Sequence, residues 1–122
     1  VKDAYTKAVE AYKTASTLNP LNPGIKLAIA RVYFADGKTK EAIDSAKEAL
    51  TLKPDYIEAL ITISQIEKSD GNTSSAISYA EQALSLAPDN KDLIDYVNSL
   101  KNGTSITPPS TAPTTNNTKA KQ

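Results

Sequence analysis

A fixed period of 34 residues is the feature that most constrains how this chain folds. Pro20, Pro54 and Pro88 stand 34 residues apart (54 minus 20, and 88 minus 54). Four further sets of residues fall into the same register: Ala8, Ala42 and Ala76; Val9, Ile43 and Ile77; Ala15, Ala49 and Ala83; and Leu18, Leu52 and Leu86. Self-similarity at a fixed period of this length is typical of repeat architectures. The chain is therefore expected to fold as stacked copies of one unit.

Each copy has the apolar spacing of two helices joined by a tight turn. In the second complete copy the apolar residues before the turn are Ala59, Leu60, Ile63 and Ile66, and those after it are Ala76, Ile77, Ala80, Ala83 and Leu84. Both sets recur at intervals of three and four residues, which is the helical spacing. Gly71 lies between them and suits the left-handed position that ends a helix. Each copy thus predicts helix, turn, helix.

The period and the spacing together predict an all-α chain of about six helices. We expect them near residues 3–17, 23–35, 39–52, 56–69, 73–86 and 90–101. Each proline-containing turn starts the first helix of a pair, and Asn22, Asp55 and Asp89 are the expected N-cap residues. One pair cannot bury both of its apolar faces alone, whereas stacked pairs bury them against one another. The expected architecture is a solenoid.

These residues resemble the tetratricopeptide repeat (TPR) family. The resemblance rests on the period, the small residues of the first helices (Ala30 and Ser64), the turn glycines Gly37 and Gly71, the alanines of the second helices, and the closing prolines. It covers about residues 1–102 and implies a right-handed helix-turn-helix solenoid. Lys26 replaces a bulky apolar residue of the family pattern, and Glu67 replaces an aromatic one. We expect looser packing or a local polar contact at both places.

The register also predicts the domain organisation. Residues 1–22 form a half repeat, 23–56 and 57–90 form full repeats, and 90–102 form a capping helix. Residues 103–122 are rich in Thr and Pro and predict a disordered or extended tail, because they cannot bury enough apolar surface.

The first predicted helix, 3–17, lacks the helix that normally pairs with it. We therefore expect the chain to be a fragment of a larger, bacterial protein, and to form a homodimer through its N-terminal end. Thr/Pro-rich tails are common in exported bacterial proteins, which slightly favours an extracytoplasmic location over a cytoplasmic one. A membrane anchor elsewhere in the parent protein is compatible with this location.

Composition excludes several classes of function. Fourteen basic residues balance fourteen acidic ones, so no net charge attracts nucleic acid. Cys and His are absent, and the remaining residues form no catalytic constellation, so we predict no enzyme, no cofactor and no metal site. Asp89, Asp92 and Asp95 are expected to form a solvated acidic face. No run of about 18 apolar residues exists, so no direct membrane contact is expected.

The remaining function is binding of a protein or peptide partner. The resemblance implies that the first helices line a concave groove, whose candidate residues here are Leu27, Arg31, Phe34, Ile61, Thr62, Gln65, Lys68, Asp92 and Asp95. We expect Leu27, Arg31 and Phe34 to be the main contacts, for an apolar residue next to an acidic group. The alternative is that Phe34 is covered by the turn and Arg31 is solvated or paired.

Two further alternatives concern the whole chain. The repeats are either a structural or self-associating segment, or the soluble repeat region of a membrane-anchored glycan-processing enzyme. One branch of the TPR family clamps the C-terminal carboxylate of chaperones with Lys, Asn and Arg side chains. Here those positions hold Leu27, Arg31, Thr62, Asp92 and Tyr96. Binding of a chaperone tail is therefore not expected.

Overall fold

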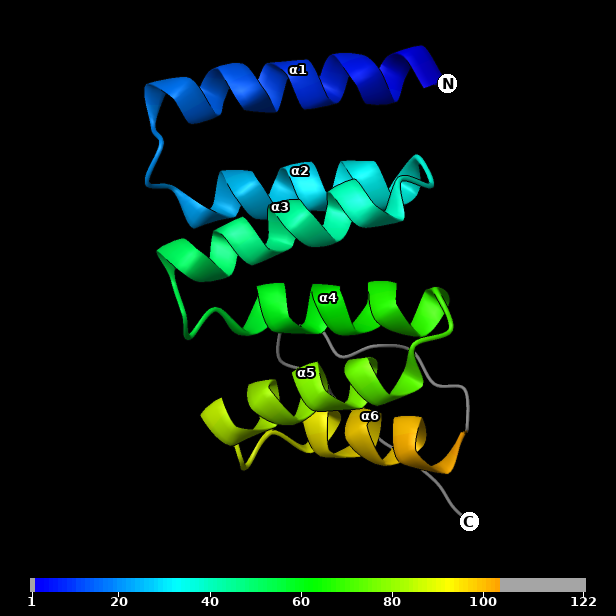
Figure 1. The fold of residues 1–122 in the computed structure, drawn as a ribbon. Helices are drawn as coiled ribbons and strands as arrows, with labels where there is room; N and C mark the ends of the chain where they lie inside the picture. The colour runs from blue at the N-terminus through cyan, green and yellow to red at the C-terminus, as the bar shows by residue number, and fades with distance from the viewer. Residues whose placement is uncertain (1, 104–122) are drawn as a thin grey trace.

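The computed structural model describes residues 2–103, which form six α-helices and no strand (Figure 1). The helices are α1 (Lys2–Leu18), α2 (Pro23–Ala35), α3 (Thr39–Leu52), α4 (Ile57–Ser69), α5 (Thr73–Leu86) and α6 (Lys91–Asn102). Each predicted helix is present, and its ends agree within one residue. The all-α prediction is confirmed. The predicted tail, from residue 104 onward, lies outside the described residues.

The helices stack as pairs along one direction (Figure 1). α2 packs on α3 and α4 packs on α5, while α1–α2, α3–α4 and α5–α6 contacts join one pair to the next. Gly37 and Gly71 follow α2 and α4 with φ of 80° and 87°, the left-handed conformation that glycine adopts without steric cost. The chain is thus a right-handed helix-turn-helix solenoid.

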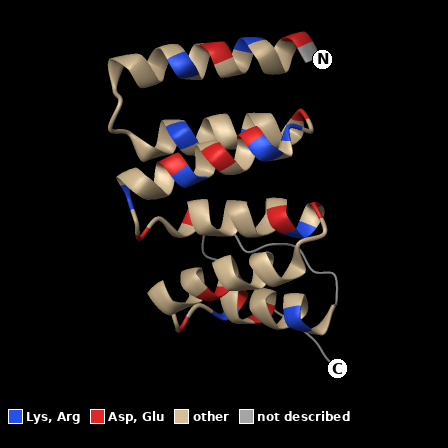
Figure 2. Ribbon diagram, in the orientation of Figure 1, with Lys and Arg blue, Asp and Glu red and all other residues tan. Residues whose placement is uncertain are grey.

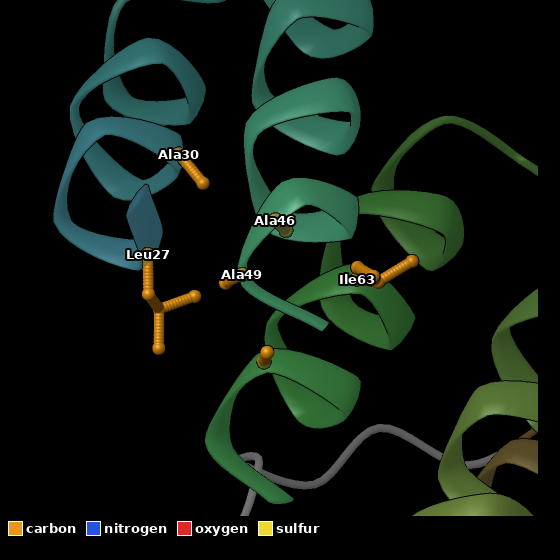
Figure 3. Packing of buried hydrophobic residues seen from close by; sticks show 6 residues of the cluster. Leu27, Ala30, Ala46, Ala49 and Ile63 are labelled. Atoms are coloured by element: carbon orange, nitrogen blue, oxygen red, sulfur yellow. The ribbon is translucent and has the colours of Figure 1, made fainter. Parts of the chain in front are cut away.

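Small side chains in the second helices let the stacked helices approach closely. Six alanines of α3 and α5 are fully buried, namely Ala42, Ala46, Ala49, Ala76, Ala80 and Ala83. Figure 3 shows Leu27 and Ala30 of α2 and Ile63 of α4 around Ala46 and Ala49 of α3. The buried core therefore joins one helix pair to the next, since α3 packs on both α2 and α4.

The helix caps differ from the prediction at two of three places. Asn22 caps α2 as expected, because its Oδ1 accepts a hydrogen bond from the Gly24 N–H at 2.9 Å. The predicted caps Asp55 and Asp89 are wrong, since α4 and α6 begin one residue later. Asn90 caps α6, and its Oδ1 accepts from the Leu93 N–H at 3.2 Å. The cap position thus follows the register of 22, 56 and 90.

Glu67, which replaces an aromatic residue of the family pattern, makes a local polar contact. This is one of the two outcomes expected there, the other being looser packing. Asn72 Nδ2 donates to Glu67 Oε1 at 2.8 Å, and Ser75 Oγ donates to Oε2 at 3.0 Å. These bonds tie the end of α4 to the start of α5. They also explain why the Asn72 side chain makes no capping bond, although Asn72 is the N-cap residue of α5.

A buried hydrogen-bond network joins the last three helices. Ser64 of α4 and Tyr96 of α6 are 0% and 1% exposed. Ser64 Oγ donates to the Ala76 carbonyl of α5 at 2.7 Å and lies 3.1 Å from the Tyr96 hydroxyl. Because the Ser64 proton is used on Ala76, the Tyr96 hydroxyl donates to Ser64 Oγ. The network holds α6 against both helices of the preceding pair.

Removing either partner of this network is expected to destabilise the fold. Tyr96→Phe loses one hydrogen bond and should lower the free energy of unfolding by about 1 kcal/mol. Ser64→Ala leaves the buried Tyr96 hydroxyl without its acceptor and should cost more, about 1–3 kcal/mol. Urea unfolding of both variants measures the difference. A smaller loss for Ser64→Ala than for Tyr96→Phe would contradict this network.

The same tyrosine predicts a loss of stability at high pH. Burial raises the pKa of Tyr96 above its usual value of 10.0. The folded state therefore holds the phenol proton more tightly than the unfolded state does. The resulting stabilisation is complete below pH 10 and is lost as pH rises through the folded pKa. Urea midpoints between pH 8 and pH 11 should fall less in Tyr96→Phe, and equal falls would refute the assignment.

Candidate functional site

The nine predicted groove residues lie on three neighbouring helices. α2 carries Leu27, Arg31 and Phe34; α4 carries Ile61, Thr62, Gln65 and Lys68; and α6 carries Asp92 and Asp95. α2 packs directly on α4, and the bond between Ser64 and Tyr96 connects α4 to α6. We call these three helices, the first of each pair, the first-helix row.

Three of the nine residues are buried. Leu27, Ile61 and Thr62 are 2%, 5% and 4% exposed. Leu27 packs in the core with Ala30 and Ala49, so the prediction that it is a main contact residue is revised. Its side chain is needed for the packing of α2 on α3 and α4. Thr62 Oγ1 donates to the Glu58 carbonyl at 2.8 Å within its own helix.

The other six residues are accessible to different extents. Arg31 and Asp95 are exposed, whereas Phe34, Gln65, Lys68 and Asp92 are half-buried. Arg31 and Lys68 form no ion pair within residues 2–103. Asp95 Oδ2 lies 3.5 Å from Lys91 Nζ on the exposed side of α6. Among the nine residues, the basic groups thus lie on α2 and α4 and the acidic groups on α6.

Tyr56 is a residue of this row that the sequence analysis missed. It occupies the cap position where the other repeats have Asn22 and Asn90, and it makes no capping bond. Burial raises the pKa of its hydroxyl, nearby Glu58 raises it further, and Arg31 opposes the shift, so the phenol lies within electrostatic reach of both charges. A Cβ at Gly24 would lie 3.8 Å from the hydroxyl. The sequence signal for Tyr56 is that it stands where the neighbouring repeats have the capping residues Asn22 and Asn90.

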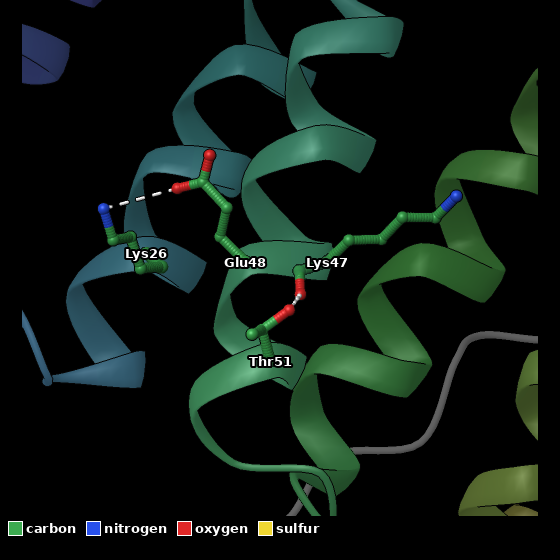
Figure 4. A network of polar contacts seen from close by, with 4 residues as sticks. All are labelled: Lys26, Lys47, Glu48 and Thr51. Atoms are coloured by element: carbon green, nitrogen blue, oxygen red, sulfur yellow. Dashed lines mark hydrogen bonds and ion pairs between the residues drawn. The ribbon is translucent and has the colours of Figure 1, made fainter.

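A hollow of about 600 Å³ lies between α1 and α3, with α2 as its floor. Its lining residues are Lys13, Ser16, Thr17, Pro20, Lys26, Ile29, Tyr33, Glu41, Asp44, Ser45 and Glu48. Lys26 Nζ lies 3.3 Å from Glu48 Oε1 and joins α2 to α3 (Figure 4). Lys26 therefore has both expected features, a polar contact and looser packing. The hollow shares no residue with the nine predicted ones.

Charged residues are unevenly distributed over the second helices (Figure 2). α3 carries Lys40, Glu41, Asp44, Lys47 and Glu48, whereas the equivalent helix α5 carries only Glu81. Within residues 2–103, no group of three or more acidic side chains is placed to hold a metal ion. None of the described helices is both long and apolar enough to cross a lipid bilayer.

The outer face of α1 is uncovered, in contrast to the same face of α3 and α5. Tyr12 is 38% exposed, whereas Ala46 and Ala80, at the same place in the following repeats, are 0% exposed. α2 and α4 cover the corresponding faces of α3 and α5. No described helix covers this face of α1.

Stacked helix-turn-helix pairs with a 34-residue period define the chain as a helical-repeat solenoid. The sequence model of the tetratricopeptide repeat family matches residues 24–56 and 57–90, which is more than half of the chain. The chain belongs to the tetratricopeptide repeat family. No curated protein sequence matches it significantly.

Solved structures with the same fold come from several organisms. A thermophilic TPR protein of Thermus thermophilus is 28% identical, with a TM-score of 0.77 over 82% of this chain and 51% of that one. The chain thus spans about half the length of that protein. The first TPR domain of Spaghetti (RPAP3), bound to an HSP90 peptide, is 21% identical, with a TM-score of 0.73 over 83% and 80%. The second TPR domain of human RPAP3, in complex with an HSP70 peptide, is 24% identical, with a TM-score of 0.70 over 80% and 81%.

Proposed function

We propose that the chain is a protein-interaction module that binds an extended segment of a partner protein along the first-helix row. Membership of the TPR family supports this, because two solved TPR domains of the same fold are in complex with short peptides, SRMEEVD and SGPTIEEVD. The proposal gives the chain a binding role and no catalytic one.

The observation that carries the proposal is the charge arrangement of the row. Arg31 is exposed without an ion pair in the described part of the chain, and Phe34, three residues further along α2, is half-buried. An aromatic surface beside an unpaired guanidinium suits an apolar residue next to a carboxylate. At the other end of the row, a basic residue of the segment would share Asp95 with Lys91, which would fix the direction of the bound segment.

The partner is not expected to be a chaperone tail. The family's carboxylate-clamping positions hold no Lys or Asn here, and Tyr96, which occupies one of them, is buried and bonded to Ser64. Leu27 and Thr62, at two others, are also buried. We therefore place the carboxylate of the partner segment near Arg31 and Lys68 instead.

Truncating the contact residues should weaken binding. Arg31→Ala and Phe34→Ala are each expected to reduce affinity for peptides selected from an array by about tenfold or more, because truncating a hot-spot residue costs about 2 kcal/mol or more. Lys47→Ala, an exposed basic residue of α3, is the matched control and should bind as the wild type does. Wild-type affinity in both variants, with unchanged helicity, would place the site elsewhere.

A second candidate function is self-association through α1. The exposed Tyr12 lies on a face that helices cover in the following repeats, and a second copy of the chain is the proposed partner for it. In a longer bacterial protein, which we propose as the parent, a neighbouring helix would cover this face instead of a second copy. The alternative that these repeats are the soluble region of a membrane-anchored glycan-processing enzyme concerns the parent protein, and it stays a prediction.

Self-association predicts a concentration-dependent mass. Light scattering at millimolar protein should give a mass above that of the monomer, because pairing removes the Tyr12 face from water. Tyr12→Lys should return the mass toward the monomer value. Thr14→Lys adds the same charge two residues away, on the other side of α1, and is expected to leave the mass unchanged. A monomeric wild type at this concentration would exclude the dimer.

A further inference from the structure

The two gaps between consecutive second helices can be compared residue by residue. In the gap between α3 and α5, Leu60 is 2% exposed, and Leu50 and Tyr79 pack against the same core cluster. The residues 34 positions earlier are Lys26, Ser16 and Ser45. Where the gap between α3 and α5 has three large apolar or aromatic side chains, the gap between α1 and α3 has two serines and a lysine. The hollow between α1 and α3 is the space that these exchanges leave.

Two buried serines of the hollow have no side-chain hydrogen-bond partner within residues 2–103. Ser16 and Ser45 are 8% and 9% exposed, and both line the hollow. Neither hydroxyl forms a hydrogen bond with a residue of the described range. Leaving a buried hydroxyl unpaired costs about 1–3 kcal/mol, so native proteins rarely do it without a reason. The hollow therefore offers two hydrogen-bonding groups above an apolar floor that contains Ile29, which is 5% exposed.

An acidic wall is also specific to this gap. Glu41, Asp44 and Glu48 line it, whereas their equivalents in the second gap are Ser75, Ser78 and Gln82. Glu48 pairs with Lys26, and Asp44 Oδ2 lies 3.0 Å from Lys40 Nζ. Glu41 forms no ion pair within residues 2–103. The wall thus has one carboxylate, Glu41, open to a basic ligand group. Lys13 also lines the hollow, with its Nζ 6.0 Å from the centre of the Tyr33 ring.

We propose that this hollow binds a tyrosine side chain of a partner protein, with a lysine or arginine next to it. A tyrosine already fills the equivalent place in the second gap, where Tyr79 stands in the register of Ser45. A bound phenol ring would pack on Ile29 and Tyr33, and its hydroxyl would pair with Ser16 or Ser45. The adjacent cation would meet Glu41. A volume of about 600 Å³ is in the usual range of ligand pockets.

This site shares no residue with the nine groove residues, so the two proposals can fail independently. Its test uses p-cresol, which is the tyrosine side chain, with toluene as the analogue that lacks the hydroxyl. Titration of the isotope-labelled chain with p-cresol should give saturable shifts at the amides of Ser16, Ile29 and Ser45. Toluene should bind more weakly because it cannot pair with the serines. N-acetyl-Lys-Tyr-amide should bind more tightly than N-acetyl-Glu-Tyr-amide.

A variant that fills the hollow should abolish this binding. Ser45→Tyr introduces the residue found at position 79, and it should weaken p-cresol binding by about tenfold or more. Ser74→Tyr adds an exposed tyrosine to α5 and serves as the matched control. Ser16→Leu fills the hollow from the other side and decides the matter if Ser45→Tyr does not fold. Absence of saturable shifts, retention of binding in the filled variants, or shifts confined to the nine groove residues would overturn the proposal.

Discussion

Close approach of helices at buried alanines is the constraint on which the rest of the structure depends. Ala42, Ala46 and Ala49 are 0% exposed, and larger side chains there would push α3 away from α2 and α4. The same three positions are alanine in α5. Because each pair leaves an apolar face that only the next pair can cover, stability accumulates from contacts between neighbours. The 34-residue period arises because every pair must present the same small and apolar residues to its neighbour.

Departures from the register mark the places where the molecule differs from a bare stack of repeats. Glu67 exchanges an aromatic contact for two hydrogen bonds, and Lys26 exchanges an apolar one for an ion pair with Glu48. Tyr56 gives up a helix cap and places its phenol near Arg31 and Glu58. Both proposed binding surfaces contain such residues. Residues that depart from the local preferences of the fold are expected at binding sites.

The period alone predicted the helices to within one residue, because apolar spacing and turn glycines act locally. It did not predict that Leu27 is buried, since the rotation of α2 about its axis is set by packing against α3 and α4. Asp55 and Asp89 were plausible caps by residue type, but the register of Asn22 and Asn90 placed the cap one residue later. The hollow was not predicted, although the sequence holds its signal: Ser16, Lys26 and Ser45 stand 34 positions before Leu50, Leu60 and Tyr79.

Native-state hydrogen exchange on the two terminal helices tests the central claim that neighbour contacts in the 34-residue register set local stability. α6 buries Leu93, Tyr96, Val97 and Leu100, whereas Val9 and Ser16 are the buried residues of α1 among those described. Amides in the middle of α1 should therefore exchange through an opening of lower free energy than amides in the middle of α6. Equal protection of the two helices, or greater protection of α1, would contradict this account.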